Sequence, residues 1–489
     1  MSGAHSSECC GSLFGYTAEV NADTTDGGSM AFDLTPTPAQ HELIARTHDF
    51  AENVVRPVAS RYDREQEFPW EVLEEAARAG FYSPLFYRDL IGDPTGLSLP
   101  MFMEELFWGC AGIGLAVVMP ALALSAIGQA ASPEQMLEWA PECFGTPGDL
   151  KLAALAISEP EGGSDVRNLR TRARRDGDDW ILDGHKMWIG NGGIANVHVV
   201  NAVVDEELGH KGQALFIVPG GTPGLKLVRK LDKLGCRASH TAELLFENCR
   251  IPGANLLGGE DKLEHKLAKA REAVEGGKHS GSATLGTFEQ TRPMVAAQAL
   301  GIARASLEYA TRYANEREAF GGPIIDKQGI AFPLADLAMR IDAARLLTWR
   351  ASWMAASGIP FERGEGSMSK LAASEVAVDS TERAIQTCGG WGYITDHPLE
   401  KWYRDAKLYT IFEGTSEIQR VVISHALGAN DGAPPLHVEM EPAGSMFSKK
   451  FGRGTSARTK AMDTAMSWKD RVPAPAMKAA MSFIRPPKK

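Results

Sequence analysis

The amino-acid sequence predicts an α+β fold in three parts: an N-terminal helical domain, a central β domain and a C-terminal domain like a four-helix bundle. Apolar residues recur every three or four positions from about residue 36 to 150 and again from 291, which is the period of amphipathic helices. Between them, runs rich in β-branched residues, such as NVHVVNAVVD (196–205), are typical of strands. No G-x-G-x-x-G follows a strand and helices do not alternate with strands, so a Rossmann nucleotide site is not expected.

The domain boundaries follow changes in this pattern. The first residues are small and polar, without the basic start and apolar core of a secretion signal, and predict a disordered extension. After the β domain, a charged helical piece followed by Gly- and Ser-rich sequence predicts a surface insertion with a linker. The expected parts are an extension (1–33), the N-terminal helical domain (34–150), the β domain (151–257), the insertion (258–290), the C-terminal helical domain (291–428) and a basic tail (429–489).

The longest uncharged stretch lies within the N-terminal helical part. AGIGLAVVMPALALSAIG (111–128) just reaches the length of a membrane span. Its glycines and Pro120 favour a buried pair of helices instead.

Local signals order the other two domains. In RRDGDDWILDGHKMWI (174–189), Asp176-Gly177 and Asp183-Gly184 predict two hairpin turns between strands. In the C-terminal domain, two apolar stripes at helical spacing predict two long helices. The stripes are Leu300, Ala303, Leu307, Ala310 and Ala314, and then Ile330, Leu334, Leu337, Ile341 and Ala344.

Composition is that of an ordinary soluble protein, with 489 residues, 44% hydrophobic and 23% charged. The formal net charge is −11, yet residues 448–489 carry a net +9, so a basic tail follows an acidic body. We expect a flexible solvated tail, with weak contact to a membrane surface as the alternative. The seven cysteines are scattered without C-x-x-C or histidines at metal spacing, which predicts no disulfide framework, no metal site and a reducing cytoplasm.

A lone carboxylate stands out in YTIFEGTSEIQRV (409–421). Glu413 lies between the apolar pair Ile411-Phe412 and a glycine. It could be a solvated residue before a helix capped by Thr415 or Ser416. It could also be a catalytic base, and the segment by itself leaves both interpretations open.

Six stretches together resemble the acyl-CoA dehydrogenase family, over about residues 36 to 428. Each alone is weak, but six in the family's order are specific. They are ISEPEGGSD (157–165), GHKMWIGNGG (184–193), KLGCRASHTAELLFENCRIP (233–252), TRP (291–293), REAFGGPIIDKQGI (317–330) and QTCGGWGYITDHPLEKWYRDAKLYTIFEGTSEIQR (386–420). The resemblance implies FAD bound to a helical, β, helical architecture.

The resemblance also implies that Glu413 is the base that removes the α proton of an acyl thioester. Loss of water and an apolar wall such as Phe412 raise the pKa of a carboxylic acid and so its basicity. The family's other position for a base is here Thr291, which has no carboxylate. By similarity, the backbone N–H of Glu413 and a ribityl hydroxyl of FAD hold the thioester oxygen. The implied substrate-binding residues are Ser164, Thr291, Arg292 and Gly414.

For FAD, the resemblance implies contacts from two groups of residues and two positions after the base. One group follows the flavin: Ile157, Ser158, Gly163, Ser164, Trp188 and Gly190. The other contacts FAD across a subunit interface: Arg317, Phe320, Gln328, Gln386, Gly389 and Gly390. Thr415 and Glu417 follow the base. Taken alone, Trp188 would be a core residue, Arg317 a surface ion-pair partner and Gly389-Gly390 a helix C-cap.

Two departures from the family carry hypotheses. Gly190 stands where the family usually has a threonine whose hydroxyl meets the flavin, which predicts an altered flavin potential or a faster reaction with oxygen. Gly258 to Arg292 is longer than the family usually has, so the insertion either clamps a bulky acyl carrier or decorates the surface.

The implied function is FAD-dependent α,β-desaturation of an acyl-CoA to the trans-2-enoyl-CoA, with electrons passed to electron-transfer flavoprotein. A homodimer or homotetramer is expected because FAD spans subunits, and no nucleic acid or metal is expected. The alternatives are an acyl-CoA oxidase and a non-catalytic protein that binds CoA thioesters.

Overall fold

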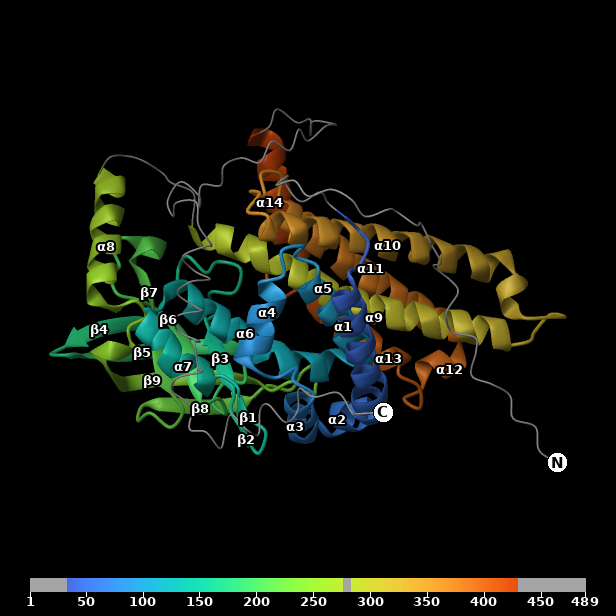
Figure 1. Cartoon of the computed structure of the whole chain (residues 1–489), viewed down its shortest axis with the longest axis horizontal. Helices are drawn as coiled ribbons and strands as arrows, with labels where there is room; N and C mark the ends of the chain where they lie inside the picture. The colour runs from blue at the N-terminus through green and yellow to red at the C-terminus, as the bar shows by residue number, and fades with distance from the viewer. Residues whose placement is uncertain (1–32, 276–282, 430–489) are drawn as a thin grey trace. The chain divides into compact units, whose positions relative to one another are not determined.

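The computed structural model of the chain describes residues 33–275 and 283–429 (Figure 1). The N-terminal part is helical, and its first helix begins with a capping box in which Thr37 and Gln40 satisfy each other's backbone N–H groups. The helices are α1 (Pro38–Phe50), η1 (Ala51–Val55), α2 (Arg56–Glu65), α3 (Trp70–Arg78), α4 (Pro84–Ile91), α5 (Ser98–Gly109), α6 (Ala111–Ala130) and α7 (Pro133–Glu142).

Helix α6 is long and apolar enough to cross a membrane, but 67% of its most apolar window is buried inside the protein. It packs against α5 and the short strand β3 (Ala153–Ala156) as one continuous helix, so the expected pair of helices is wrong. The glycines allow close packing instead of a turn. A Cβ on Gly114 would lie 2.9 Å from the ring of Phe107, and one on Gly112 would lie 3.2 Å from Ala238.

The central part is a seven-stranded sheet with strand order β3-β6-β4-β5-β9-β8, in which β7 pairs with the other side of β6. β3 runs parallel to β6, and the β6–β7, β4–β5, β5–β9 and β8–β9 pairs are antiparallel. A small hairpin of β1 (Gly145–Thr146) and β2 (Asp149–Leu150) precedes it. The sheet strands are β3 (Ala153–Ala156), β4 (Arg172–Asp176), β5 (Asp179–Gly190), β6 (Val197–Val203), β7 (Gln213–Pro219), β8 (Leu225–Lys230) and β9 (Thr241–Pro252), with short helices η2 (Gly209–Gly212) and η3 (Gly253–Asn255).

Only one of the two Asp-Gly pairs makes a turn. Asp176 pairs with Asp179 across a two-residue hairpin loop that contains Gly177. Asp183-Gly184 lies inside β5 at a register shift against β9, so the second predicted turn is wrong. The glycine is needed there because a Cβ on Gly184 would lie 2.4 Å from the hydroxyl of Thr171.

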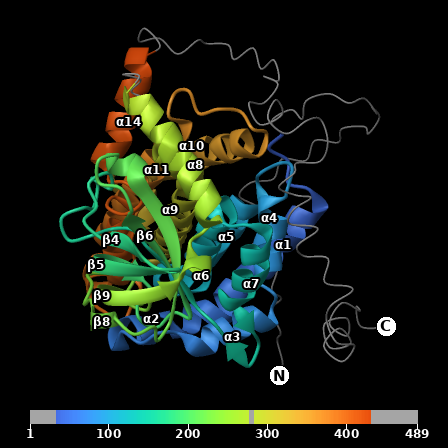
Figure 2. The same ribbon diagram turned by 90° about the vertical axis from the view of Figure 1, so that its left-hand side faces the viewer.

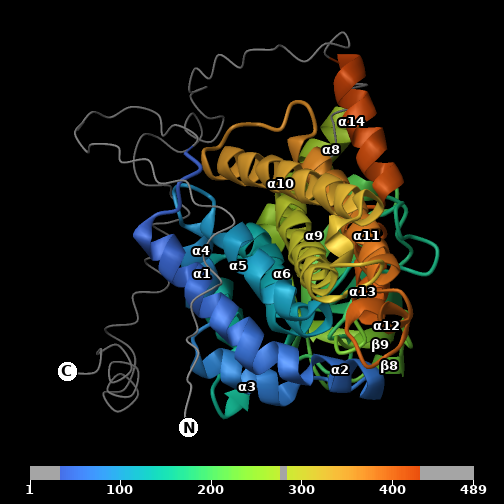
Figure 3. The same ribbon diagram turned by 90° about the vertical axis from the view of Figure 1, so that its right-hand side faces the viewer.

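The C-terminal part is a bundle built around three long helices, α9, α10 and α11 (Figure 3). Both predicted stripes face its core: Leu300, Ala303 and Leu334 are among their buried members. Helices α13 and α14 pack on α11, and α5 packs on α9. The elements are α9 (Ala283–Glu316), η4 (Ile324–Asp326), α10 (Gln328–Ala356), α11 (Glu365–Cys388), α12 (Gly390–Tyr393), α13 (Leu399–Tyr409) and α14 (Ser416–Ala429). This helical, β, helical order confirms the predicted fold class.

The charged part of the predicted insertion is helical as expected, and most of its Gly- and Ser-rich part lies outside the described residues. Helix α8 (Gly259–Glu275) packs along the side of the β domain (Figure 2). Helix α9 then begins at Ala283, eight residues before the expected start of the bundle. Apart from Gly286, residues 283–290 carry no residue that ends a helix, and one glycine costs only about 1 kcal/mol.

Five of the seven cysteines lie in the described ranges. Cys110, Cys143, Cys236, Cys249 and Cys388 are free and buried. Among the described residues no group of histidine, cysteine, aspartate and glutamate side chains could hold a metal ion. The expectations for the N-terminal extension and the basic tail, membrane contact included, concern residues that lie outside the described ranges except at their inner ends.

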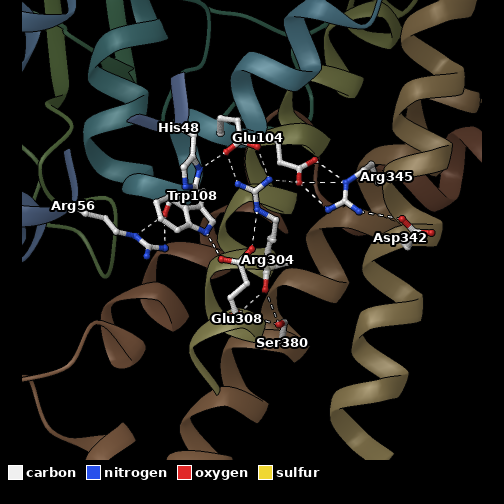
Figure 4. A network of polar contacts seen from close by, with 12 residues as sticks. His48, Arg56, Glu104, Trp108, Arg304, Glu308, Asp342, Arg345 and Ser380 are labelled. Atoms are coloured by element: carbon white, nitrogen blue, oxygen red, sulfur yellow. Dashed lines mark hydrogen bonds and ion pairs between the residues drawn. The ribbon is translucent and has the colours of Figure 1, made fainter. Parts of the chain in front are cut away.

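A buried ionic network joins the N-terminal helices to the bundle (Figure 4). Arg304 of α9 contacts both Glu104 and Glu105 of α5, at 3.2 and 2.6 Å. Arg345 of α10 binds Glu104 at 2.8 Å, and His48 of α1 binds Glu105 at 2.8 Å. Burial alone would raise the pKa of Glu105, but the hydrogen bonds from His48 and Arg304 lower it to about 2.

We expect this network to contribute strongly to stability. Replacement of Arg345 in R345M leaves the Glu104 carboxylate with one cation fewer in a site where its side chain is only 6% exposed, which should cost about 3 kcal/mol. R78M is the matched control, because Arg78 forms its ion pairs on the surface with a side chain 57% exposed, where a pair is worth about 1 kcal/mol or less. Urea unfolding followed by tryptophan fluorescence measures both; equal losses would contradict the assigned role.

Candidate active site

The loop between α13 and α14 carries Glu413 in a conformation that few side chains adopt. Glu413 has φ of +53° and Gly414 has φ of +85°. A positive φ is uncommon for a residue other than glycine, and such strain gathers at functional sites. Thr415 accepts a hydrogen bond from the N–H of Ile418 at 3.2 Å and so caps α14. The capping role therefore falls to Thr415, while Glu413 stands before the helix.

Two buried cations lie beside Glu413: Arg292 of α9 and Lys370 of α11. Burial raises the pKa of Glu413 above its ordinary value, while the charges of Lys370 and Arg292 and a hydrogen bond from Thr291 oppose the rise. The same burial lowers the pKa of Lys370 to about 8 and that of Arg292 to about 10. The site therefore holds a carboxylate of raised basicity next to two desolvated positive charges.

The backbone of this loop is held by side chains. Lys370 Nζ donates to the carbonyl oxygen of Gly414 at 2.7 Å. Gln419 Nε2 donates to the same oxygen at 2.7 Å and to the carbonyl oxygen of Glu413 at 3.3 Å. Arg292 is held in turn by Ser367, whose Oγ accepts from Nη1 at 2.6 Å. The predicted residues Thr291, Arg292, Glu413 and Gly414 thus lie together at one place.

A second buried lysine fixes the segment that begins at Ile157. Lys186 Nζ donates to the carbonyl oxygen of Ile157 and to Glu159 Oε1, both at 2.8 Å. The N–H of Met187 donates to the carbonyl oxygen of Ser158 at 2.9 Å. Ile157 and Ser158 are half-buried over β5, whereas Gly163 and Ser164 are exposed. The segment is therefore rigid at its start and open at the two residues expected to meet a ligand.

Trp188 is not a core residue. Its side chain is 55% exposed, and its φ of +60° turns it out of β5 at an irregularity of the β5–β9 pairing. A Cβ on Gly163 would lie 3.8 Å from Trp188 Cζ3, so the exposed ring lies against the glycine. An exposed indole next to backbone without a side chain offers a flat face for another ring.

Gly190 lies against Met119 of α6. A Cβ at this position would lie 2.7 Å from Met119 Cε and 2.8 Å from its sulfur. The thioether therefore occupies the space that a side chain at residue 190 would need. Met119 is the neighbour that sequence patterns did not reveal.

The other implied FAD residues gather elsewhere, at the far end of the bundle. Arg317, Gly389 and Gly390 line an open cavity of about 560 Å³, together with Tyr313, Ile324, Thr387, Cys388, Trp391 and Ile394. Phe320 is 93% exposed and Tyr393 82% exposed, and Gln328 and Gln386 are also exposed. Gly389 is also the C-cap of α11, with φ of +60°, so this residue both ends the helix and lines the cavity. Glu417 is exposed in the first turn of α14.

The two regions are too far apart to hold the same part of a ligand. Arg292 lies on α9 and Arg317 directly follows its end, 25 residues later. At the helical rise per residue this places them about 37 Å apart. Within one chain, the cavity and Glu413 therefore cannot contact the same part of one ligand.

Three family models cover nearly all of the described chain. They match the N-terminal domain of acyl-CoA dehydrogenases over residues 37–146, the middle domain over 154–249 and the C-terminal domain over 280–428. The chain belongs to the acyl-CoA dehydrogenase family. It is thus an oxidoreductase of a family that depends on FAD.

Relatives and solved structures agree with this membership. The mitochondrial short-chain specific acyl-CoA dehydrogenase of Rattus norvegicus is 42% identical over 390 residues, 79% of this chain and 90% of that protein. The butyryl-CoA dehydrogenase of Megasphaera elsdenii superposes with a TM-score of 0.71 at 32% identity, over 81% of this chain and 99% of the other. The prolyl acyl carrier protein oxidase AnaB gives 0.68 at 29% identity, over 81% and 100%. The fold is thus shared by dehydrogenases and an oxidase.

Lys370 lies outside every sequence motif, whereas Gln419 lies inside the motif 386–420 without a role predicted for it. Lys370 lies on the same buried face of α11 as Ala373 and Ala377, at helical spacing. A single cation on a helix face otherwise made of small, uncharged residues is the signal that could have indicated it. In this acyl-CoA dehydrogenase its partner lies 44 residues later, and only the fold brings them together.

We expect Lys370 to set both the position and the pKa of the base. Loss of its charge in K370M raises the pKa of Glu413 further, and since the base acts only when deprotonated, the acid limb of the pH–rate profile moves to higher pH. Q419L is the matched control, because it removes hydrogen bonds to the same loop but no charge, and should slow the reaction without that shift. Anaerobic stopped-flow measurement of substrate-dependent flavin reduction over a range of pH tests this. Identical pH–rate profiles for the two variants would show that the charge of Lys370 does not affect the base and that only its hydrogen bond matters.

A threonine at position 190 should be accommodated only after Met119 is shortened. G190T alone overpacks the contact and should cost about 1–3 kcal/mol, whereas M119A/G190T should recover most of that loss. Urea unfolding midpoints measure the stability, and the flavin midpoint potential of the double variant measures the effect of the restored hydroxyl. Equal stability of G190T and the unaltered protein would contradict the packing argument.

Proposed function

We propose that this acyl-CoA dehydrogenase desaturates short-chain acyl-CoA thioesters between the α and β carbons and passes the electrons to electron-transfer flavoprotein. The observation that carries the chemistry is Glu413, a carboxylate of raised pKa on a strained loop beside buried Arg292 and Lys370. The similarity to a short-chain enzyme and to butyryl-CoA dehydrogenase supports the chain-length class. The non-catalytic alternative loses ground because the residues around Glu413 are all in place.

In this mechanism Glu413 removes the α proton of the thioester. Its raised pKa makes the carboxylate a better proton acceptor, and the nearby positive charges keep enough of it deprotonated to act. The backbone N–H of Glu413, in the loop held by Lys370 and Gln419, would donate to the thioester oxygen as negative charge develops there. Bound FAD would supply the hydride acceptor for the β carbon.

The residues present fit FAD in two separate groups. The exposed face of Trp188 beside Gly163, on the segment fixed by Lys186, suits the flavin ring. Ile157, Ser158, Ser164 and Gly190 would complete this group, with Thr415 and Glu417 close to the base. The distant cavity with Arg317, Gly389 and Gly390 suits the anionic, nucleotide end of FAD from a neighbouring subunit. The exposed Phe320, Gln328 and Gln386 do not line the cavity and would complete this group.

This division requires at least a homodimer, and we propose a homotetramer. Trp391 and Ile394 line the cavity and are exposed together with Tyr393, and a contiguous exposed apolar patch marks an interaction surface, which supports an interface there. A cytoplasmic location stays a prediction from the sequence.

An oxidase remains the second candidate, favoured by Gly190 and by the similarity to an oxidase of the same fold. The two are separated by how the reduced flavin is reoxidised. We expect electron-transfer flavoprotein to reoxidise it much faster than dissolved oxygen. The reverse order, with hydrogen peroxide formed in stoichiometric amounts, would establish the oxidase.

Glu413 is tested directly by E413Q. The amide cannot accept the α proton, so reduction of the flavin by butyryl-CoA should slow by about 10²–10⁴-fold while FAD stays bound. E382Q is the control, because Glu382 is exposed on α11 away from this loop. Anaerobic absorbance of the flavin band measures both reduction and cofactor content; an E413Q variant as fast as E382Q would disprove the mechanism.

The chain-length class is tested by the same assay with butyryl-, octanoyl- and palmitoyl-CoA. We expect the highest kcat/KM for butyryl-CoA. A preference for palmitoyl-CoA would overturn the short-chain proposal and leave the role of Glu413 intact.

A further inference from the structure

Helix α8 lies in the part of the chain that the family does not explain. The model of the middle domain ends at residue 249 and that of the C-terminal domain begins at 280, so α8 falls between them. It is nevertheless attached firmly to the β domain. Leu263 is buried, Glu260 accepts from Trp180 Nε1 at 2.9 Å, and Arg271 binds Asp205 at 2.6 Å. These contacts hold α8 in a fixed position on the β domain.

Gln213, the first residue of β7, connects α8 to the segment expected to meet the substrate. Its buried side chain donates to the carbonyl oxygens of Val166 at 3.1 Å and Arg167 at 3.3 Å. Its own carbonyl oxygen accepts from Lys266 of α8. The residues just before it form η2, which contacts α8 and contains His210 and Lys211. Three segments distant in sequence therefore meet around one buried amide.

The carboxylates of this corner are largely neutralised by other arginines. Asp205 binds Arg271, Glu206 binds Arg172, and Glu161 lies 3.6 Å from Arg170. Within the described ranges, 33–275 and 283–429, the three cations Arg167, Lys211 and Lys266 form no ion pair with a carboxylate. Their positive charge is therefore available to a ligand.

His210 reports the sign of the local field. It is half-buried in η2 among these cations. Burial and the charges of Arg167, Lys211 and Lys266 all lower its pKa. The corner is thus positively charged even though the chain as a whole is acidic.

We propose that Arg167, Lys211 and Lys266 bind phosphate groups of the CoA part of the substrate, and that α8 is present to supply Lys266. This rests on the proposed function, because a CoA thioester carries its phosphates at the end remote from the reacting carbons. Arg167 follows the implied substrate residue Ser164 by only three positions, so a ligand that passes Ser164 reaches this corner next. Guanidinium and ammonium groups are the side chains that recognise phosphate. The insertion is then part of the substrate site.

The test measures binding of CoA and of 3′,5′-ADP to the FAD-loaded enzyme by calorimetry. K266E and, as a second variant, K211E should each weaken both by about tenfold or more, as expected for loss of a charge-assisted contact. K269E is the matched control: Lys269 is exposed on the same helix but is not among the cations that act on His210 or Lys266, and the charge change is the same. Its affinities should stay within about twofold.

A substrate without phosphates separates phosphate binding from a structural effect. Turnover of butyryl-pantetheine should be the same in K266E and the unaltered enzyme, while kcat/KM for butyryl-CoA falls. Unchanged affinities for CoA and 3′,5′-ADP in both variants, an equal loss with butyryl-pantetheine, or displacement of 3′,5′-ADP by inorganic phosphate at similar concentration would each overturn the proposal. If no acyl thioester reduces the flavin but 3′,5′-ADP binding responds to K266E, the proposed function fails and the phosphate site stands.

Discussion

The contact of Arg304 with Glu104 and Glu105 fixes helix α9 against α5, and the rest of the site is positioned from there. α9 is 34 residues long, carries Arg292 in its first third, and is followed directly by Arg317. Arg292 lies 12 residues before Arg304, about 18 Å along the helix, and Arg317 lies 13 residues after it. A slip of α9 by one turn would move both groups by about 5 Å in the same direction. A buried ion pair is well suited to set the position of α9 along α5, because separating the partners leaves a buried charge without compensation.

Arg304 fixes the position of a whole helix, and two buried lysines fix short backbone segments of the site. Lys186 binds the carbonyl oxygen of Ile157, and Lys370 binds that of Gly414. Both are desolvated, with the pKa of each lowered to about 8, which is costly for an ammonium group. In both places the cation orders backbone that other residues then use: one segment for the expected flavin and one for the base. The site is therefore built largely from backbone segments whose carbonyl oxygens are bound by buried ammonium groups.

How much of this could be predicted depends on where the information lies. Glu413, Arg292 and the segment from Ile157 are recognisable because each belongs to a contiguous motif. Lys370 and Met119 are not, since each acts on a partner that only tertiary packing supplies. Gln419 lies inside the motif 386–420, but which atoms its amide binds is set by the turn at Glu413 and Gly414. The same limit explains the errors: Asp183-Gly184 has the composition of a turn, but close approach of Thr171 makes it a glycine inside a strand. Likewise the glycines of α6 indicate close neighbours, and a sequence cannot distinguish that demand from a break in a helix.

The distance along α9 between Arg292 and Arg317 has a genetic consequence under the proposed arrangement of two subunits around each FAD. A subunit defective only near the base still presents an intact far cavity, and one defective only in the cavity still presents an intact base. Mixed assemblies of two such subunits would contain some active sites in which the base from one subunit and the cavity from the other are both intact. Two alleles that are inactive separately should then partly complement each other in one cell, whereas two alleles with lesions at the same end of α9 should not.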